Sequence, residues 1–270
     1  MQQVAENVYR LGTAYHNFYL LTERGKATVV DAGASKELPK LEVGLTSLGM
    51  KRDDVEAIIL THAHADHIGF AAEAQAAGTE VRTSEVEAPL ATGEEPVHAI
   101  KIPQLPLFKL GTWKFLVALI RVGVMKAPSV ESVVTFADGE TLDLPGSPQA
   151  VYAPGHPVGH ASFYLADRKL LLTGDAIATR DLFSDRTGPQ FMPDAFHTDP
   201  AQARASLDIL AGLDTTLVLP GHGHPYEGSI ADAVATAKGY APSVLAYMTA
   251  AVFRPGLRKT KKARKPQLPQ

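Results

Sequence analysis

The sequence predicts an α/β (α+β) fold in which two β-sheets pack together and helices cover them on the outside. Two observations lead to this prediction. Strand-like runs occur in clusters with helix-like segments between them, in both halves of the chain, which is the pattern of a layered domain. The chain has 270 residues and is 45% hydrophobic, so it can bury one sizeable core.

The first half of the chain is predicted to begin with strands and then to alternate between helices and strands. Short apolar or β-branched runs bounded by polar turns indicate strands, and longer segments stopped by a glycine, such as Gly49 or Gly78, indicate helices. The predicted elements are strands at 8–11, 18–22 and 28–31, a helix at 35–49, a buried strand at 57–60 and a helix at 68–77.

The second half is predicted to be richer in strands and to close with helices. Asp138-Gly139 is a strong hairpin signal between two of these strands. Asp199-Pro200 is typical of a helix start, because aspartate caps the first turn and proline suits the first helical position. The predicted elements are strands at 133–136, 141–144, 150–152, 162–165, 170–173 and 216–219, and helices from 199 to about 210 and at 229–253.

We expect one domain over residues 1–253 and a basic tail over residues 254–270. The tail holds seven Lys and Arg and no acid, a composition typical of a disordered segment. The whole chain has a formal charge of −3, but without the tail it carries 19 Lys and Arg against 29 Asp and Glu. An acidic body argues against nucleic-acid binding, so no specific nucleic-acid partner is expected.

The chain contains no cysteine, so disulfides and thiolate metal ligands are excluded. Any metal must then be held by His and carboxylate side chains. The first ten residues lack the apolar core of a signal peptide, which predicts a cytoplasmic protein. The longest apolar run, residues 115–125, is interrupted by Arg121 and falls short of the ~20 residues that a membrane span needs.

The densest chemical signal is the segment 61–67, Thr-His-Ala-His-Ala-Asp-His, which follows a predicted strand. Residues at positions i and i+2 of an extended segment point the same way, so His62 and His64 can bind one ion. Asp66 and His67 lie slightly further on and can reach a second ion beside it. Imidazole and carboxylate ligands without a thiolate suit Zn²⁺, and also Fe or Mn.

Three later segments each place a ligand-type residue directly after an apolar strand, with glycine beside it. They contain His156 and His160, then Asp175, then His222 and His224. Glycine permits the tight backbone approach that a ligand loop needs. A lone Gly-His is most often a turn, but the four segments together, in this order, are a stronger signal than any one of them.

In this order the four segments resemble the metallo-β-lactamase superfamily, over about residues 4–230, including the run Val29-Val30-Asp31-Ala32-Gly33. The resemblance implies a four-layer αβ/βα sandwich with two metal ions at one edge of the sheets. By motif position it implies His62, His64 and His156 as ligands of the first metal, Asp66, His67 and His222 as ligands of the second, and Asp175 as a bridge.

The resemblance also implies lesser roles for three neighbouring residues. His160 would support the metal site or the fold, and His224 would be a loop residue. Asp31 would either support the site from behind the ligands or only cap the end of its strand, and both interpretations stay open.

The implied function is that of a hydrolase with two divalent metal ions, for which zinc is favoured. Two such ions lower the pKa of a bridging water, and the resulting hydroxide attacks an ester, thioester or lactone carbonyl. Asp66 would be both a ligand and the catalytic residue that passes a proton to the leaving group. Two other classes stay open: a membrane-surface or partner-binding protein with a secondary metal site, and an iron-dependent oxidoreductase on the same fold.

The branch within the superfamily is less defined. Asp175 at the bridging position resembles the glyoxalase II and lactonase branches. However, Ala178 stands where acyl-homoserine lactonases carry a tyrosine, and no cluster of basic residues suited to glutathione occurs in the C-terminal half before Arg254. The expected partner is therefore a small molecule. One interpretation of the insert at residues 96–130 adds that this molecule has an apolar or acyl part.

Residues 96–130 are an unusual insert with five bases, no acid and the single tryptophan, Trp113. Three interpretations stay open: a helical subdomain packed on the core, an apolar lid over the metal site, and docking to a membrane surface. The lid would use Leu105, Leu107, Phe108, Trp113, Phe115, Leu116 and Leu119, with Lys109, Lys114, Arg121 and Lys126 at its rim.

Overall fold

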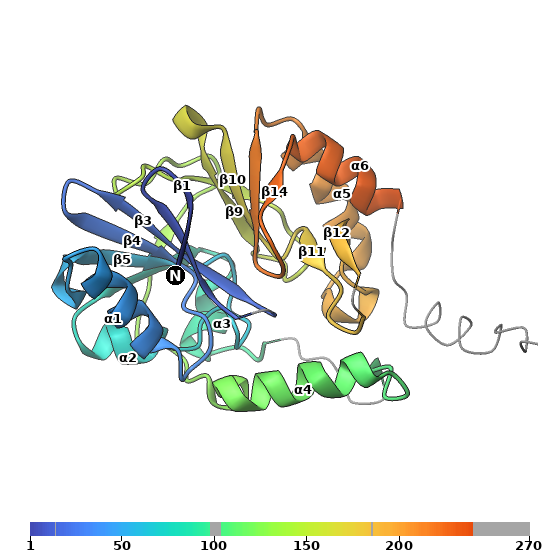
Figure 1. The fold of residues 1–270 in the computed structure, drawn as a ribbon, viewed down its shortest axis with the longest axis horizontal. Helices are drawn as coiled ribbons and strands as arrows, with labels where there is room; N and C mark the ends of the chain where they lie inside the picture. Colours follow the sequence, from blue (N-terminus) through green and yellow to red (C-terminus); the bar gives the residue numbers. More distant parts are fainter. Residues whose placement is uncertain (14, 98–103, 185, 240–270) are drawn as a thin grey trace, which may run out of the picture.

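The computed structural model describes residues 1–13, 15–97, 104–184 and 186–239, and in this part of the chain the expected four-layer sandwich is confirmed (Figure 1). The first sheet contains, in spatial order, β1 (Gln2–Ala5), β2 (Val8–Gly12), β3 (Asn17–Glu23), β4 (Lys26–Val30), β5 (Val55–Ile59), β6 (Glu80–Ser84) and β7 (Val134–Phe136). The second sheet contains β14 (Tyr226–Glu227), β13 (Leu217–Pro220), β10 (Leu170–Gly174), β9 (Ala161–Leu165) and β8 (Gln149–Tyr152). A separate hairpin consists of β11 (Ala178–Arg180) and β12 (Thr187–Gln190).

Helices cover the outer face of each sheet (Figure 1). The first sheet is covered by α1 (Leu38–Ser47), α2 (Ala71–Ala76) and α3 (Ala88–Thr92). The second sheet is covered by α5 (Pro200–Ala211) and α6 (Ile230–Gly239). The insert forms α4 (Leu110–Val122), which runs along the lower edge of the view in Figure 1.

Strand β3 shows how the layers are held together. Successive side chains of a strand point to opposite faces. Phe18 and Leu20 accordingly pack in the cluster that includes α1 and α2, whereas Tyr19 and Leu21 pack against the second sheet. A strand that is buried on both faces reads as a continuous apolar run, and this explains why the first half was predictable.

The prediction of a strand at residues 141–144 is wrong. Within the described residues only Thr141 pairs with a strand, in an isolated bridge to Gln149. The chain reverses directly afterwards, because Pro145 and Pro148 have no N–H to give to a ladder and Ser147 has a φ of 44°. The Asp138-Gly139 turn is present, with Gly139 at a φ of 76° and its N–H bonded to the carbonyl of Ala150.

Other boundaries shift by a few residues. Helix α1 begins at Leu38 rather than at 35, and α2 begins at Ala71 because residues 68–70 belong to the ligand loop. Asp199 caps α5 as expected, accepting from the N–H groups of Ala201 and Gln202. The helix expected at 229–253 is described as far as Gly239, and its remainder, like the tail at 254–270, lies outside the described residues. None of the described helices is long and apolar enough to span a membrane.

Candidate metal centre

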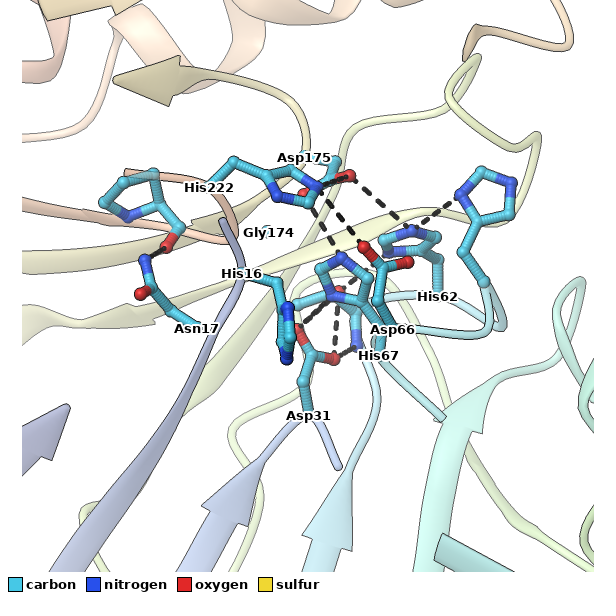
Figure 2. Close-up of polar contacts among 12 residues, drawn as sticks. His16, Asn17, Asp31, His62, Asp66, His67, Gly174, Asp175 and His222 are labelled. Carbon is cyan, nitrogen blue, oxygen red and sulfur yellow. Dashed lines mark hydrogen bonds and ion pairs between the residues drawn. The ribbon is translucent and has the colours of Figure 1, made fainter. Parts of the chain in front are cut away.

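The seven candidate ligands follow the ends of strands from both sheets and meet at one edge of the sandwich. Figure 2 labels His62, Asp66, His67, Asp175 and His222 among them. Strands β4 and β5 run parallel in the first sheet, and β10 and β13 run parallel in the second. Parallel strands carry their carboxyl ends to the same edge, so the loops after β5, β10 and β13 deliver His62, Asp175 and His222 to one place. Glycine is required beside them: a Cβ on Gly221 would lie 2.2 Å from an Asp175 oxygen.

The first group contains His62, His64, His156 and Asp175, whose ligand atoms all lie within 4.8 Å of one another. His62 Nε2 lies 3.0 Å from His64 Nδ1. His156 Nε2 lies 3.2 Å from Asp175 Oδ2. Three imidazoles and a carboxylate at these separations match the donor set of a zinc or iron site.

The second group contains Asp66, His67 and His222, and Asp175 contacts it as well. Asp175 Oδ1 is 3.4 Å from His67 Nε2, and Asp175 Oδ2 is 2.9 Å from His222 Nε2. The side chain of Asp66 is 17% exposed, whereas that of His67 is fully buried. Asp175 therefore stands between the two groups, and Asp66 stands at their solvent side.

Hydrogen bonds on the far side of the rings decide which nitrogen faces the centre. His67 Nδ1 lies 2.8 Å from Asp31 Oδ2, and His222 Nδ1 contacts the carbonyl oxygen of Tyr15. Both partners can only accept, so each Nδ1 carries a proton, and each Nε2 is the ring nitrogen that faces the centre and could bind a metal ion. This is the arrangement by which supporting groups orient metal-binding histidines.

Asp31 also orients His62, through Thr61. The Thr61 hydroxyl has one proton and lies 3.0 Å from both Asp31 oxygens, so it donates to that carboxylate. It can then accept from His62 Nδ1, which is 2.9 Å away, and the Nε2 of His62 is left to face the centre. Asp31 further accepts from the backbone N–H of Thr61 at 2.8 Å. Asp31 therefore contacts the candidate ligand His67 directly and His62 through Thr61, and it also bonds to the backbone at the end of the strand. The two interpretations of Asp31 are thus compatible with each other.

His160 and His224 differ in their placement. His160 is buried, and its Nε2 accepts from the backbone N–H of Asp175 at 3.1 Å. Burial lowers the pKa of His160 to about 3, which keeps this ring neutral and able to accept. His224 is exposed in the loop after β13, as expected for a loop residue.

Two buried neighbours of the candidate ligands, His197 and Glu87, are not predicted from the sequence. His197 Nδ1 lies 3.2 Å from His156 Nδ1, behind the first group. Glu87 is fully buried and accepts from the backbone N–H groups of Ala63 and Gly159, which belong to two different ligand loops. No local spacing links these residues to the ligands, because His197 is 41 positions from His156 and Glu87 is 24 positions from Ala63.

The electrostatics of the centre favour a bound cation. Burial alone would lower the pKa of His67, but the carboxylates of Asp175 and Asp31 raise it well above its usual value. Burial would likewise raise the pKa of Asp175, but His222 and His67 hold it well below its usual value. His67 Nε2 lies 3.4 Å from Asp175 Oδ1 and His156 Nε2 lies 3.2 Å from Asp175 Oδ2, but none of the three buried atoms His67 Nε2, His156 Nε2 and Asp175 Oδ1 forms a hydrogen bond of regular geometry in the described residues. Positive charge is thus stabilised where these buried donor atoms converge, and divalent metal ions fit this donor set.

A sequence profile described as Metallo-beta-lactamase superfamily matches residues 11–222 of the chain, which include all seven candidate ligands. This chain belongs to the metallo-β-lactamase superfamily. Membership fits the αβ/βα sandwich and the position of the His and Asp residues at its edge.

Two named proteins and a solved structure are similar to this chain over most of its length. The chain is 27% identical over 237 residues to a Bacillus subtilis (strain 168) protein named Probable metallo-hydrolase YflN, covering 84% of this chain and 87% of that protein. It is 31% identical over 207 residues to a Hydroxyacylglutathione hydrolase of Dechloromonas aromatica (strain RCB), covering 76% of this chain but only 56% of that protein. The solved structure of TTHA1623 in a di-iron-bound form is 26% identical, with a TM-score of 0.56 and coverage of 86% and 98%. The chain is accordingly a metal-dependent hydrolase of the metallo-β-lactamase fold that acts on a small molecule.

Proposed function

We propose that the protein is a dinuclear hydrolase of esters, thioesters or lactones, with Asp175 bridging the two metal ions. The observation that carries the proposal is the position of Asp175, whose two oxygens lie 3.2 Å from His156, 3.4 Å from His67 and 2.9 Å from His222. The first ion would be held by His62, His64 and His156. The second would be held by Asp66, His67 and His222.

When bound, the two ions would supply a hydroxide nucleophile at neutral pH and polarise the scissile carbonyl. Asp66 would act as the proton carrier, since it is the carboxylate on the solvent side of the centre and its Oδ2 lies 3.8 Å from His222 Nε2. Burial would raise the pKa of Asp66, but His67 and His222 lower it, so this carboxylate is ionised at neutral pH. The ionised form is the one that a proton carrier would need at the start of the reaction. Asp66 would take up a proton and then return it to the leaving group.

The proposal is tested by metal analysis together with a substrate panel. Protein reconstituted with zinc should bind two ions per chain and hydrolyse at least one class among esters, thioesters and lactones. The relative named Hydroxyacylglutathione hydrolase is the reason to include a glutathione thioester. A single ion per chain, or no turnover in all three classes, would overturn the proposal.

We also propose that the substrate has an apolar or acyl part, which the inner face of α4 would contact. Phe115 packs on Tyr15 with 5.6 Å between ring centroids, and Tyr15 is the residue whose carbonyl orients His222. Met192 packs in the same apolar cluster, and its carbonyl is bonded to His197 behind the first metal group. The inner face of α4 is thus one residue away from His222, a candidate ligand of the second ion, and two residues away from His156, a candidate ligand of the first.

The seven residues of the expected lid fall into two groups, one buried or packed in an apolar cluster and one exposed. Leu105 and Phe115 are buried in the apolar cluster beside the centre, and Leu116 and Leu119 pack against it. Leu107, Phe108 and Trp113 are instead 38%, 56% and 53% exposed. An acyl-binding role is therefore proposed for the first four residues only.

The identity of the metals is open to a direct test. The donor set of imidazole and carboxylate suits zinc, iron and manganese alike, and TTHA1623 is a relative described in a di-iron-bound form. We propose zinc as the catalytic metal. Zinc-loaded protein that turns over esters, beside an iron-loaded form that consumes no oxygen, would support this choice, whereas oxygen uptake by the iron form would favour an oxidoreductase.

A second candidate function rests on the outer face of α4. Leu110, Trp113, Val117 and Ile120 share one face by their spacing and are 43–71% exposed. The exposed basic residues Lys114 and Arg121 flank them, and residues 96–130 contain no acid. This combination suits docking to an anionic lipid surface, which could deliver an apolar substrate.

Vesicle binding tests this second candidate, because Trp113 is the only tryptophan and its fluorescence reports on α4 alone. Phosphatidylglycerol vesicles should shift its emission to the blue, and salt should reverse the shift. Ile120→Asp should abolish binding, whereas Ile209→Asp, which alters a 55% exposed residue on α5, should not. Equal behaviour with phosphatidylcholine vesicles, or no shift, would rule out this mode of docking.

A further inference from the structure

His197 is a buried histidine that the proposed chemistry does not use. It lies between the chain segment that carries Met192 and the loop that carries His156. Its Nδ1 is 3.2 Å from His156 Nδ1, and its Nε2 is 3.1 Å from the carbonyl oxygen of Met192. Only 3% of the residue is exposed.

The hydrogen bonds fix where the protons of this pair lie. The Met192 carbonyl can only accept, so His197 Nε2 carries a proton and donates it. A histidine that binds a metal ion through Nε2 keeps its remaining proton on Nδ1, so His156 as a metal ligand would donate from Nδ1 to His197 Nδ1, 3.2 Å away. His197 Nδ1 is then the acceptor of this pair, and His156 Nε2 lies 3.2 Å from Asp175 Oδ2.

The plane of the His197 ring is fixed as well. Phe191 stacks on it with 4.2 Å between centroids and an interplanar angle of 17°. The guanidinium of Arg204 covers the Phe191 ring at 4.2 Å and is paired with Asp194 at 3.0 Å. A ring held on one face and at both nitrogens offers its acceptor in one direction only.

We propose that His197 is a positioning residue for the metal centre, which orients His156 towards the first ion by accepting its Nδ1 proton. The inference rests on the proposed role of His156 as a metal ligand. His67 and His222 are oriented by a carboxylate and a carbonyl, so His156 differs from them in depending on a neutral imidazole. The effect is confined to the first ion, because His197 contacts no candidate ligand of the second in the described residues.

Zinc affinity of the full chain, measured by competition with a chromophoric chelator, tests the inference. His197→Phe keeps the stack on Phe191 but removes the acceptor, and it should weaken one of the two zinc sites by about 10- to 100-fold. His197→Asn places an amide oxygen near the position of Nδ1 and should restore most of the affinity. His224→Phe, a matched change at an exposed histidine, should leave both sites unchanged.

A double-mutant cycle separates positioning from a merely structural role. In a His156→Ala background, His197→Phe should cause no further loss of zinc affinity, because the ring it would orient is gone. Unfolding of the chelated variants shows whether each variant folds. If His197→Phe does not fold, His197→Asn takes its place in the cycle and is compared with wild type in both backgrounds. Wild-type protein without zinc binding would refute the proposed metal centre itself. Tight binding by wild type with equal affinity in His197→Phe, or an equal loss in both backgrounds, would overturn this inference alone.

Discussion

The buried carboxylate of Glu87 accepts a hydrogen bond from the backbone N–H of Ala63 at 3.0 Å, in the middle of the first ligand loop. Its other oxygen accepts from Gly159 at 3.1 Å, in the loop that carries His156. These loops follow strands of different sheets. A single side chain thus ties the two halves of the metal centre together.

We predict that the buried carboxyl group of Glu87 makes the stability of the metal-free protein depend on pH. Burial raises the pKa of Glu87 to about 7, although its two N–H donors lower it in part. The folded state then holds its proton at pH values where the unfolded state has lost it, so the free energy of unfolding falls as pH rises from the ordinary 4.5 towards 7. The whole shift corresponds to about 3 kcal/mol.

Urea unfolding of chelated wild type and Glu87→Gln between pH 5 and 8 measures this dependence. The stability of wild type relative to the variant should fall across this range and become constant above about pH 8. Glu56→Gln, at an exposed position on β5, serves as the control and should show no such trend. A difference between wild type and Glu87→Gln that is independent of pH would contradict the prediction.

The second prediction concerns the number of metal ions. Elemental analysis of zinc-reconstituted protein should give two ions per chain in wild type and about one in His222→Ala, because that variant loses a ligand of the second site only. Asp175→Ala should lower binding at both sites, since Asp175 contacts both groups. His224→Ala is the matched control, and an unchanged count in both active-site variants would refute the assignment.

The third prediction separates chemistry from binding at Asp66. Asp66→Asn should keep the fold, because this side chain lies at the solvent side of the centre rather than in the core. Its turnover number should fall by roughly 10²- to 10⁴-fold, as expected when a general acid or base is lost. Thermal unfolding verifies the fold and zinc analysis shows whether the second ion remains. Turnover like that of wild type would exclude Asp66 as the proton carrier.

The candidate ligands could be selected from the sequence because their signal is local, and the structure brings them together. In residues 61–67 four ligand-type side chains occur within six positions, and the later histidines and Asp175 each stand beside glycine after a strand. Strand β6 is absent from the predicted elements, although Glu80-Val81-Arg82-Thr83 alternates polar and β-branched residues with the period of a strand.

The supporting residues could not be predicted because their signal exists only in three dimensions. Glu87 precedes a short helix and resembles any surface acid, and it becomes significant only where β6 and the loop after β8 meet. His197 follows a single helical turn, and only the tertiary fold, in which it stacks on Phe191 under Arg204 of α5, brings it behind His156. Such contacts depend on tertiary structure, which periodicity and turn chemistry do not specify.

The fourth prediction concerns the basic tail. Truncation after Arg254 should leave folding and turnover of a soluble substrate unchanged, because residues 255–270 have too few apolar side chains to bury a core. Thermal unfolding and steady-state kinetics of the shortened chain measure this. Loss of activity on a soluble substrate would show that the domain extends beyond the expected boundary.

The last prediction distinguishes the two faces of α4 by acyl-chain length. Leu116 packs against the apolar cluster beside the centre, whereas Trp113 is 53% exposed and its Nε1 donates to the carbonyl of Leu107. Leu116→Ala should therefore raise KM for long acyl substrates more than for short ones. Trp113→Ala should leave KM unchanged for both kinds of substrate. If α4 only packs on the sandwich, Leu116→Ala should instead lower stability and leave the preference for chain length as it is in wild type. Equal kinetics on short and long acyl substrates in wild type and in both variants would remove α4 from the substrate site.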